Sequence, residues 1–234
     1  MGATVGGFSE ILWQQQAMLP LLLLLQALPL FGAAVVFAFR ERTMAVVLGK
    51  VFALGELLLA IATLAHIDPT LPALQLAERF MPLAYHVAVD GLSLVFILSA
   101  ALLTLLMTLY GMSRGMISPG RLFAVLLLAE AGLVGMLVTV NVAWFALFSG
   151  LELWAVVYLL RRWASSRAEI QALARFVQYQ GFGWLLFAAG CVVLGWGHAE
   201  ATGGVWSFDL FDLLGAIPVG KFQTAAFYLL FYGL

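Results

Sequence analysis

The chain has 234 residues, of which 64% are hydrophobic and 10% are charged, and its formal net charge is −1. A soluble domain carries about 25% charged residues, so this composition excludes an ordinary soluble protein, and without a basic cluster we expect no nucleic-acid partner. The apolar residues come in runs of about 18–26, the length that lets a helix cross a hydrocarbon core about 30 Å thick. We therefore predict an all-α, polytopic transmembrane helix bundle in contact with lipid.

Six full membrane spans and a partial seventh are expected within one membrane domain, residues 1–234. In chain order the full spans cover residues 17–39, 44–65, 91–111, 122–140, 143–160 and 170–195, and the partial span covers 222–234. The first sixteen residues contain Glu10 and no Lys or Arg, which is unlike a signal peptide, so the first run is kept as a membrane helix. Residues 66–90 and 196–221 are expected to form longer loops outside the membrane.

Basic residues alternate between successive loops. The odd-numbered loops carry Arg40 and Arg42, then Arg114 and Arg121, then Arg161, Arg162 and Arg167, whereas the even-numbered ones carry almost none. Because Lys and Arg concentrate in cytoplasmic loops, we expect the odd-numbered loops to be cytoplasmic and the N-terminus to lie outside.

The last apolar run is too short for a membrane crossing. From Phe222 to Leu234 a helix would be about 20 Å long at 1.5 Å per residue. One interpretation begins this helix at Leu213 and continues it through Pro218 and Lys221. The other, which we favour, is that the sequence is a fragment of a longer protein or that a second chain continues the bundle after Leu234.

Three carboxylates lie near the middle of apolar spans: Glu56, Glu130 and Glu152. A carboxylate at that depth costs roughly 2.5–3.5 kcal/mol to insert, and such residues mark ion paths or proton relays. The turn between the fourth and fifth spans is short, so their helices are antiparallel neighbours, and we expect Glu130 and Glu152 to be linked directly or through water. The alternative is that each glutamate is neutral and only holds two helices together.

Two basic side chains lie inside spans. Lys50 shares the second span with Glu56 but lies about 120° away around a helix with 3.6 residues per turn, and Arg175 lies near the cytoplasmic end of the sixth span. Each could extend its charge to the membrane surface, or could hold a carboxylate in its charged state. We take both as candidate charge modulators.

No catalytic residue, cofactor site or metal site is predicted. His66, His86 and His198 fall in separate connecting segments, and Cys191 is the single cysteine, within an apolar run. No CxxC pair, glycine-rich phosphate loop or haem ligand pair is present. The sequence therefore indicates that no redox centre is carried on this chain.

Residues 85–94, YHVAVDGLSL, resemble a hallmark of one membrane-protein family, and the similarity continues at residues 101–104, 130–132, 147–153 and 175–179. The family is that of the antiporter-like membrane subunits of complex I, the proton-pumping NADH:quinone oxidoreductase, which are related to cation/proton antiporters. The M-type and D-type subunits are the most similar. The resemblance covers residues 85–195, and the first 80 residues match in hydropathy only.

The resemblance implies a membrane-arm subunit, or its N-terminal half, that forms part of a proton path in a redox-driven NAD(P)H- or ferredoxin:quinone oxidoreductase. Glu152 would be the family's fifth-helix glutamate, which pairs with a lysine two helices later, and Arg175 stands where the sixth helix usually carries lysine. The family has about fourteen helices in two inverted repeats, so this chain stops before that lysine. Counting without gaps places the family's glutamate at Gly150, about 200° around the helix from Glu152.

Two other functions stay open. The chain could be a shortened, non-conducting scaffold that spaces partner subunits, or half of an ion or inorganic-carbon transporter. The resemblance implies other membrane subunits as partners, and a bacterial inner (plasma) membrane or a thylakoid as the location.

Overall fold

The computed structural model describes residues 4–5, 8–39, 43–80, 83–113, 119–164, 166–216 and 220–233. Its helices are α1 (Leu21–Ala38), α2 (Thr43–Leu64), α3 (Gly91–Ser113), α4 (Pro119–Val138), α5 (Val142–Trp163), α6 (Arg167–Ala201), α7 (Leu210–Gly215) and α8 (Lys221–Gly233), together with a short 3-10 turn at Trp13–Gln15. Within the described residues, α1 to α6 are long and apolar enough to cross a membrane, as expected. Arg40, Arg42, Arg114, Pro218 and Leu234 lie outside the described residues.

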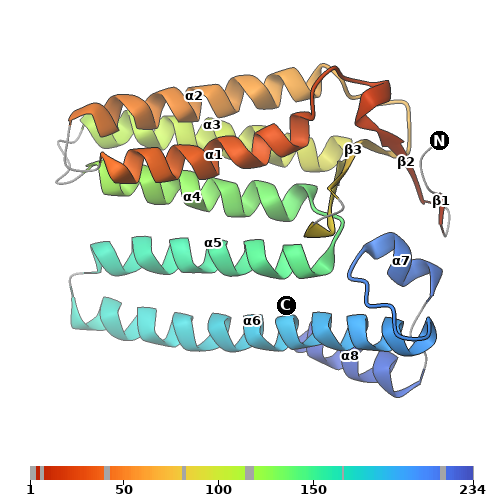
Figure 1. The fold of residues 1–234 in the computed structure, drawn as a ribbon. Helices are drawn as coiled ribbons and strands as arrows, with labels where there is room; N and C mark the ends of the chain where they lie inside the picture. Colours follow the sequence, from red (N-terminus) through yellow and green to blue (C-terminus); the bar gives the residue numbers. More distant parts are fainter. Residues whose placement is uncertain are drawn as a thin grey trace.

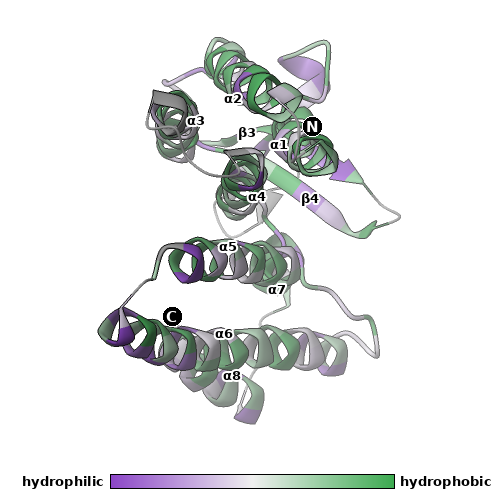
Figure 2. Cartoon of the chain, turned by 90° about the vertical axis from the view of Figure 1, so that its left-hand side faces the viewer, coloured by the Kyte–Doolittle hydropathy of each residue, from purple (hydrophilic) through white to green (hydrophobic). Residues whose placement is uncertain are grey.

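The long helices run side by side in alternating directions (Figure 1). Helices α1 to α4 form one compact group, α5 packs on α4, and α6 packs on α5 and α8. Viewed along the helices, the α1–α4 group lies on one side and α5, α6 and α8 lie on the other (Figure 2). The bundle therefore has two parts that meet where α4 packs on α5.

Side-chain caps begin several of these helices. Asp90 accepts a hydrogen bond from the Ser93 backbone N–H at 2.7 Å, ahead of α3. Asn141 accepts from the Ala143 N–H at 2.9 Å and starts α5. Ser166 and Glu169 form a capping box at α6. Each cap satisfies a backbone donor that the helix itself leaves unpaired.

Two differences from the expected spans change where residues lie. Helix α6 ends at Ala201 instead of residue 195, so His198 lies on a helix and not in a loop, with its Nδ1 2.9 Å from the Val205 carbonyl. Helix α7 ends at Gly215 and α8 starts at Lys221, so the alternative of one helix beginning at Leu213 is wrong.

A small β layer covers one end of the α1–α4 group (Figure 1). Its strands are β1 (Thr4–Val5), β2 (Phe8–Leu12), β3 (Leu74–Phe80) and β4 (Tyr85–Val89), in that order across the sheet. Strands β2 and β3 are parallel, and β3 and β4 are antiparallel. The sequence analysis predicted helices only, so this layer is an addition to the expected fold.

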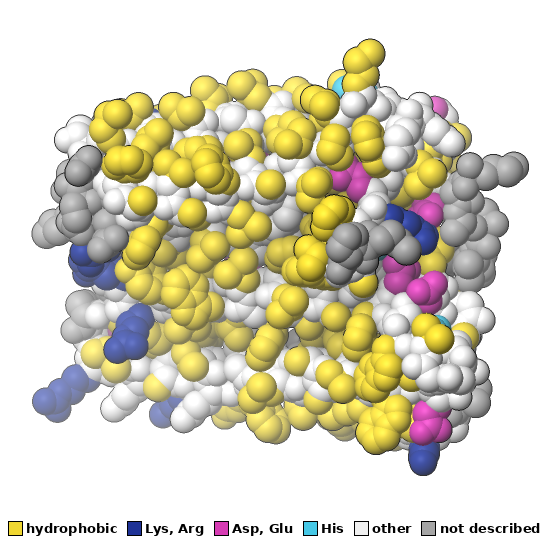
Figure 3. All heavy atoms as spheres, in the orientation of Figure 1, with side chains coloured by type: hydrophobic (Ala, Val, Ile, Leu, Met, Phe, Trp, Pro, Cys, Tyr) yellow, Lys and Arg dark blue, Asp and Glu magenta, His cyan; other side chains and the backbone are white. Residues whose placement is uncertain are grey.

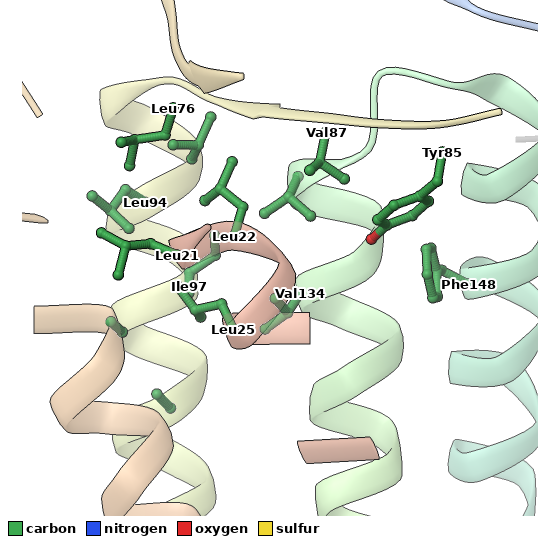
Figure 4. Close-up of a cluster of buried hydrophobic side chains, with 14 residues drawn as sticks. Leu21, Leu22, Leu25, Leu76, Tyr85, Val87, Leu94, Ile97, Val134 and Phe148 are labelled. Atoms are coloured by element: carbon green, nitrogen blue, oxygen red, sulfur yellow. The ribbon is translucent and has the colours of Figure 1, made fainter. Parts of the chain in front are cut away.

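Two clusters of buried apolar side chains fill the α1–α4 group. The β-end cluster lies under the β layer, where Leu76 and Val87 of the strands meet Leu22, Ile97 and Val134 of the helices (Figure 4). The opposite-end cluster consists of Ala33, Val36, Ala45, Ala53, Phe123, Ala124 and Leu127. The section of the bundle between the two clusters carries the polar residues described below.

Charged side chains are distributed unevenly between the two ends. Lys and Arg gather at the end formed by the α3–α4 and α5–α6 turns, whereas Asp and Glu gather at the β-layer end, together with some basic side chains (Figure 3). Hydrophobic side chains cover the length between the ends (Figure 3). This arrangement suits a protein whose two ends face water on opposite sides of a bilayer.

Candidate functional site

Four buried polar side chains, one from each of α1 to α4, occupy the section between the two apolar clusters. We call them the polar layer; they are Gln26, Glu56, Thr104 and Glu130, with exposed fractions of 4%, 0%, 8% and 3%. On α4 the layer is bounded by Leu127 of the opposite-end cluster and by Val134 of the β-end cluster. Two of the three predicted carboxylates are therefore in one enclosed section of the bundle.

The contacts within the polar layer leave most of its oxygens unpaired. Gln26 Nε2 donates to the Ala131 carbonyl at 2.9 Å. The Glu56 and Glu130 carboxyls are close enough for their charges to interact, and Thr104 lies next to the Glu130 carboxyl. Among the described residues, neither carboxyl has a hydrogen-bond partner, and neither does Gln26 Oε1.

Glu152 lies in a different compartment. It borders a pocket of about 290 Å³ between α4, α5, α6 and α8, with Ser149, Gln180, Trp184 and Gly233 among the lining residues. The Glu152 Oε2 atom has no hydrogen-bond partner among the described residues. This carboxyl is therefore partly enclosed and next to two polar side chains, Ser149 and Gln180, which suits a group that exchanges protons with water or with a neighbour.

The structure does not bring Glu130 and Glu152 together. Gly132 of α4 packs directly on α5, since a Cβ at Gly132 would lie 3.0 Å from the Glu152 backbone nitrogen. Glu130 is two residues earlier, about 200° around α4, and faces the polar layer. The short turn between α4 and α5 makes the helices neighbours as expected, but helix α4 separates the two carboxyls.

The two basic candidates lie apart from the carboxyls. Lys50 is half-buried on α2 and Arg175 is exposed on α6. Among the described residues, neither takes part in an ion pair. Gly150, where gapless counting places the family's glutamate, packs against the Trp184 ring of α6.

A third group of charges lies in the β layer and was missed by sequence reasoning. His86 of β4 contacts Glu10 Oε2 through Nε2 at 2.9 Å and Asp209 Oδ2 through Nδ1 at 2.5 Å, and Arg79 pairs with Glu10 at 2.8 Å. Both ring nitrogens of His86 can donate only when the imidazole is protonated. We call these four residues the His86 cluster; as two carboxylates and two cations, it is electrically balanced.

Asp209 shows the effect of this cluster on a carboxyl. Burial acts to raise its pKa, but the hydrogen bond and positive charge of His86, the Phe211 N–H and the charge of Arg79 together lower it. Asp209 also begins α7 and pairs with Asn141 as an isolated bridge. The cluster therefore joins the β layer over α1–α4 to the segment that leads into α8.

Glu78 of β3 holds the first turn of α1. Its two carboxyl oxygens accept hydrogen bonds from the Leu22 N–H at 2.8 Å and the Leu23 N–H at 3.0 Å. Burial raises the pKa of Glu78 from 4.5 to about 7, against the effect of these two N–H groups. A carboxyl so placed titrates near neutral pH.

We expect the contribution of Glu78 to stability to fall as pH rises from about 4.5 to about 7, by about 3 kcal/mol at most, because each pKa unit corresponds to about 1.4 kcal/mol. In this window the folded chain keeps the Glu78 proton that the unfolded chain has released. The pKa of Asp209 is lowered, so Asp209 changes the pH dependence of stability only below about its ordinary pKa of 3.8. The free energy of unfolding in detergent, measured across this range, should fall less steeply with pH in Glu78→Gln than in wild type or in Glu200→Gln; equal slopes would contradict the assignment.

Comparisons with known proteins identify relatives of the chain. A scan against models of protein families finds no match. The chain is 27% identical to F(420)H(2) dehydrogenase subunit M of Methanosarcina mazei over 84% of its own length and 40% of the relative. It is 32% identical to NAD(P)H-quinone oxidoreductase chain 4 of Gloeobacter violaceus over 73% of its own length and 33% of the relative.

The chain is a homologue of the antiporter-like membrane subunits of complex I. The resemblance seen in the sequence is thereby confirmed. The prediction that the chain is an integral membrane protein is confirmed as well. The fold is also similar to a chain in the membrane-bound sulfane sulfur reductase (MBS), an archaeal respiratory membrane complex, with a TM-score of 0.75 and 18% identity over 92% of this chain and 44% of that chain. In each comparison the chain spans less than half the length of the antiporter-like relative.

Proposed function

We propose that the chain contributes part of a transmembrane proton path to the membrane arm of a complex I-like, redox-driven proton pump. Two curated relatives bear the names of dehydrogenase and quinone oxidoreductase subunits, and the similar fold comes from a respiratory membrane complex. Other membrane subunits would be the partners, including any chain that continues the bundle after Leu234. The redox chemistry would take place in those partners.

The proposed orientation has the β layer outside and the basic end in the cytoplasm. It is supported by the gathering of Lys and Arg at one end of the bundle (Figure 3), because basic residues favour cytoplasmic loops. The membrane would be a bacterial inner (plasma) membrane or a thylakoid. The His86 cluster would then lie on the side opposite the cytoplasm.

Glu152 is the residue on which this proposal mainly depends. It is a mid-helix carboxyl beside a pocket that α4, α5, α6 and α8 enclose together, and the end of α8 at Gly233 lines the same pocket. The family resemblance implies a lysine on this seventh membrane helix as the partner of the glutamate. A carboxyl between packing helices and a neighbouring cation can take up and release protons as the cation moves.

The other candidates would act around Glu152. We propose Glu130 and Glu56 as further protonatable groups, and Arg175 and Lys50 as charges that modulate the path from the cytoplasmic end. Because α4 separates Glu130 from Glu152, a proton would need water or a partner subunit to pass between them. The half-buried Lys50 and the exposed Arg175 would act over a distance.

The test is Glu152→Gln in the assembled complex. We expect proton pumping into membrane vesicles to fall by about tenfold or more, since a positioned proton-transfer group contributes at least about that much. Glu200→Gln, at an exposed glutamate on α6, is the matched control and should pump normally. Native gel electrophoresis checks that both variants assemble.

The same experiment tests the scaffold alternative, which is favoured by the separation of Glu130 from Glu152. If Glu152→Gln assembles and pumps at the wild-type rate, the relay role is wrong. If the glutamine variants of Glu152 and Glu130 disturb only assembly, the chain acts as a non-conducting scaffold.

A further inference from the structure

The packing of α2 on α4 sets Glu56 opposite Glu130. These helices run in the same direction because α3 reverses the chain between them (Figure 1). Gly49 packs on the Phe123 ring, where a Cβ would come within 2.8 Å of Cδ2. Seven residues later on both helices stand Glu56 and Glu130, and seven residues turn a helix back to nearly the same face. The two carboxyls therefore meet across the α2–α4 interface.

The polar layer has more acceptors than donors. Five oxygens lack a hydrogen-bond partner among the described residues: both of Glu56, both of Glu130 and Oε1 of Gln26. One Nε2 hydrogen of Gln26 is already engaged by the Ala131 carbonyl, so its second Nε2 hydrogen and the Thr104 hydroxyl are the donors left for these five oxygens. Because a buried polar atom without a partner costs free energy, this layer needs a source of positive charge or of hydrogen-bond donors.

No charge on the four surrounding helices meets this need. The titratable and charged side chains of α1 to α4, within the described residues, are Lys50, Glu56, Tyr110, Arg121 and Glu130. Lys50 is half-buried and about 120° from Glu56 around α2, and Tyr110 and Arg121 are exposed. In the β layer, Glu78 lies on the far side of the β-end cluster, at the start of α1.

The polar layer is also closed along the bundle axis. The β-end cluster covers one side and the opposite-end cluster covers the other. Sideways, α4 separates the layer from Glu152, because Gly132 and not Glu130 faces α5. A ligand in the layer would therefore be occluded, and it would not compete with the proton that Glu152 exchanges.

We propose that the polar layer binds one small monovalent cation inside α1–α4, either a proton shared by Glu56 and Glu130 or a sodium ion held by the same oxygens with Gln26 and Thr104. Oxygen ligands are those preferred by hard cations, and one positive charge lowers the charge of the two buried carboxylates from −2 to −1, which they then share. This inference deepens the proposed function, since it names the ligand of two proposed relay residues. It does not depend on pumping through Glu152.

The first part of the test asks whether sodium is the ligand, and it uses the full chain in lipid nanodiscs. Sodium chloride is titrated against choline chloride at constant ionic strength, and the melting temperature is recorded. If sodium is the ligand, the melting temperature rises by about 5 °C or more at sodium well above the dissociation constant. The rise is lost in Glu56→Gln and in Glu130→Gln, and is weakened in Gln26→Leu, which keeps both carboxyls.

The proton arm uses infrared difference spectra of the same samples during a pH titration. If a shared proton is the ligand, sodium has no effect and a protonated-carboxyl band changes with pH. Either glutamine variant alone removes the band or shifts the pH at which it changes, because the two carboxyls can no longer share a proton, whereas Gln26→Leu keeps the wild-type titration. Glu200→Gln, at an exposed position, serves as the control in both arms and should behave as wild type.

The proposal is overturned if the wild-type chain shows neither a sodium-dependent melting temperature nor a pH-dependent carboxyl band that both glutamine variants shift or remove. Should those two variants fail to fold, wild type and Gln26→Leu still decide, because the wild-type responses are required in either arm. Proton pumping tests the role of Glu152 separately from cation binding. Loss of pumping in Glu152→Gln with intact cation binding supports both the relay role of Glu152 and the cation site in the polar layer. Normal pumping in Glu152→Gln with intact binding removes only the relay role.

Discussion

Replacing His86 with leucine is expected to lower the free energy of unfolding by about 3–5 kcal/mol, the cost of removing one partner from a buried ion pair. The His86 side chain is 3% exposed and its partner Glu10 is 2% exposed. Without the imidazolium, Glu10 loses its contact with a buried cation, and Asp209 loses the hydrogen bond that lowers its pKa. The measurement is denaturation of the purified chain in detergent.

His66→Leu is the matched control for this prediction. His66 is exposed, in the turn that follows α2, and its ring contacts the Ala62 carbonyl of that helix, so its loss should change stability little. Adding Glu10→Gln and Asp209→Asn to His86→Leu should restore part of the lost stability, because no carboxylate is then left without its His86 partner and the remaining charge, on Arg79, is 39% exposed. If His86→Leu and His66→Leu are equally stable, the cluster does not hold the β layer to α7.

The His86 cluster also shows why part of this site could not be predicted from the sequence. Its partners Glu10 and Asp209 are 76 and 123 residues away from His86. Both contacts depend on the β layer, and β2 pairs in parallel with β3 across more than sixty residues. Local patterns carry no information about such a pairing, so a lone histidine in a connecting segment gave no reason to suspect a charged cluster.

The membrane helices were predictable because their signal is local. Length and apolar composition alone indicate each span, and the depth of Glu56, Glu130 and Glu152 follows from position within the run. The direction in which each side chain points cannot be read from that position. The expectation that Glu130 and Glu152 communicate used the short turn between their helices, whereas Gly132, two residues from Glu130, is the position that faces α5.

The close contact between α4 and α5 leads to the second large effect. Gly135 of α4 lies against the Phe148 ring of α5, where a Cβ would be 2.6 Å from Cδ1 and Cδ2. The ring cannot easily move aside, since it stacks on Trp144 with centroids 5.8 Å apart and meets the edge of Tyr85 at 6.4 Å. Small residues at such positions let membrane helices approach closely.

Gly135→Val is therefore expected to destabilise the bundle by about 3 kcal/mol, because a branched side chain would force α4 away from α5. Gly181→Val is the matched control: a Cβ at Gly181 of α6 meets no atom within 4 Å, so the same substitution there should change little. Unfolding in detergent measures both variants. Equal stability of the two would mean that Phe148 yields and that the α4–α5 contact is not tightly packed. A loss confined to Gly135→Val would show that the wall between the polar layer and the Glu152 pocket depends on this glycine, since Gly132, three residues earlier on α4, forms the contact beside Glu152.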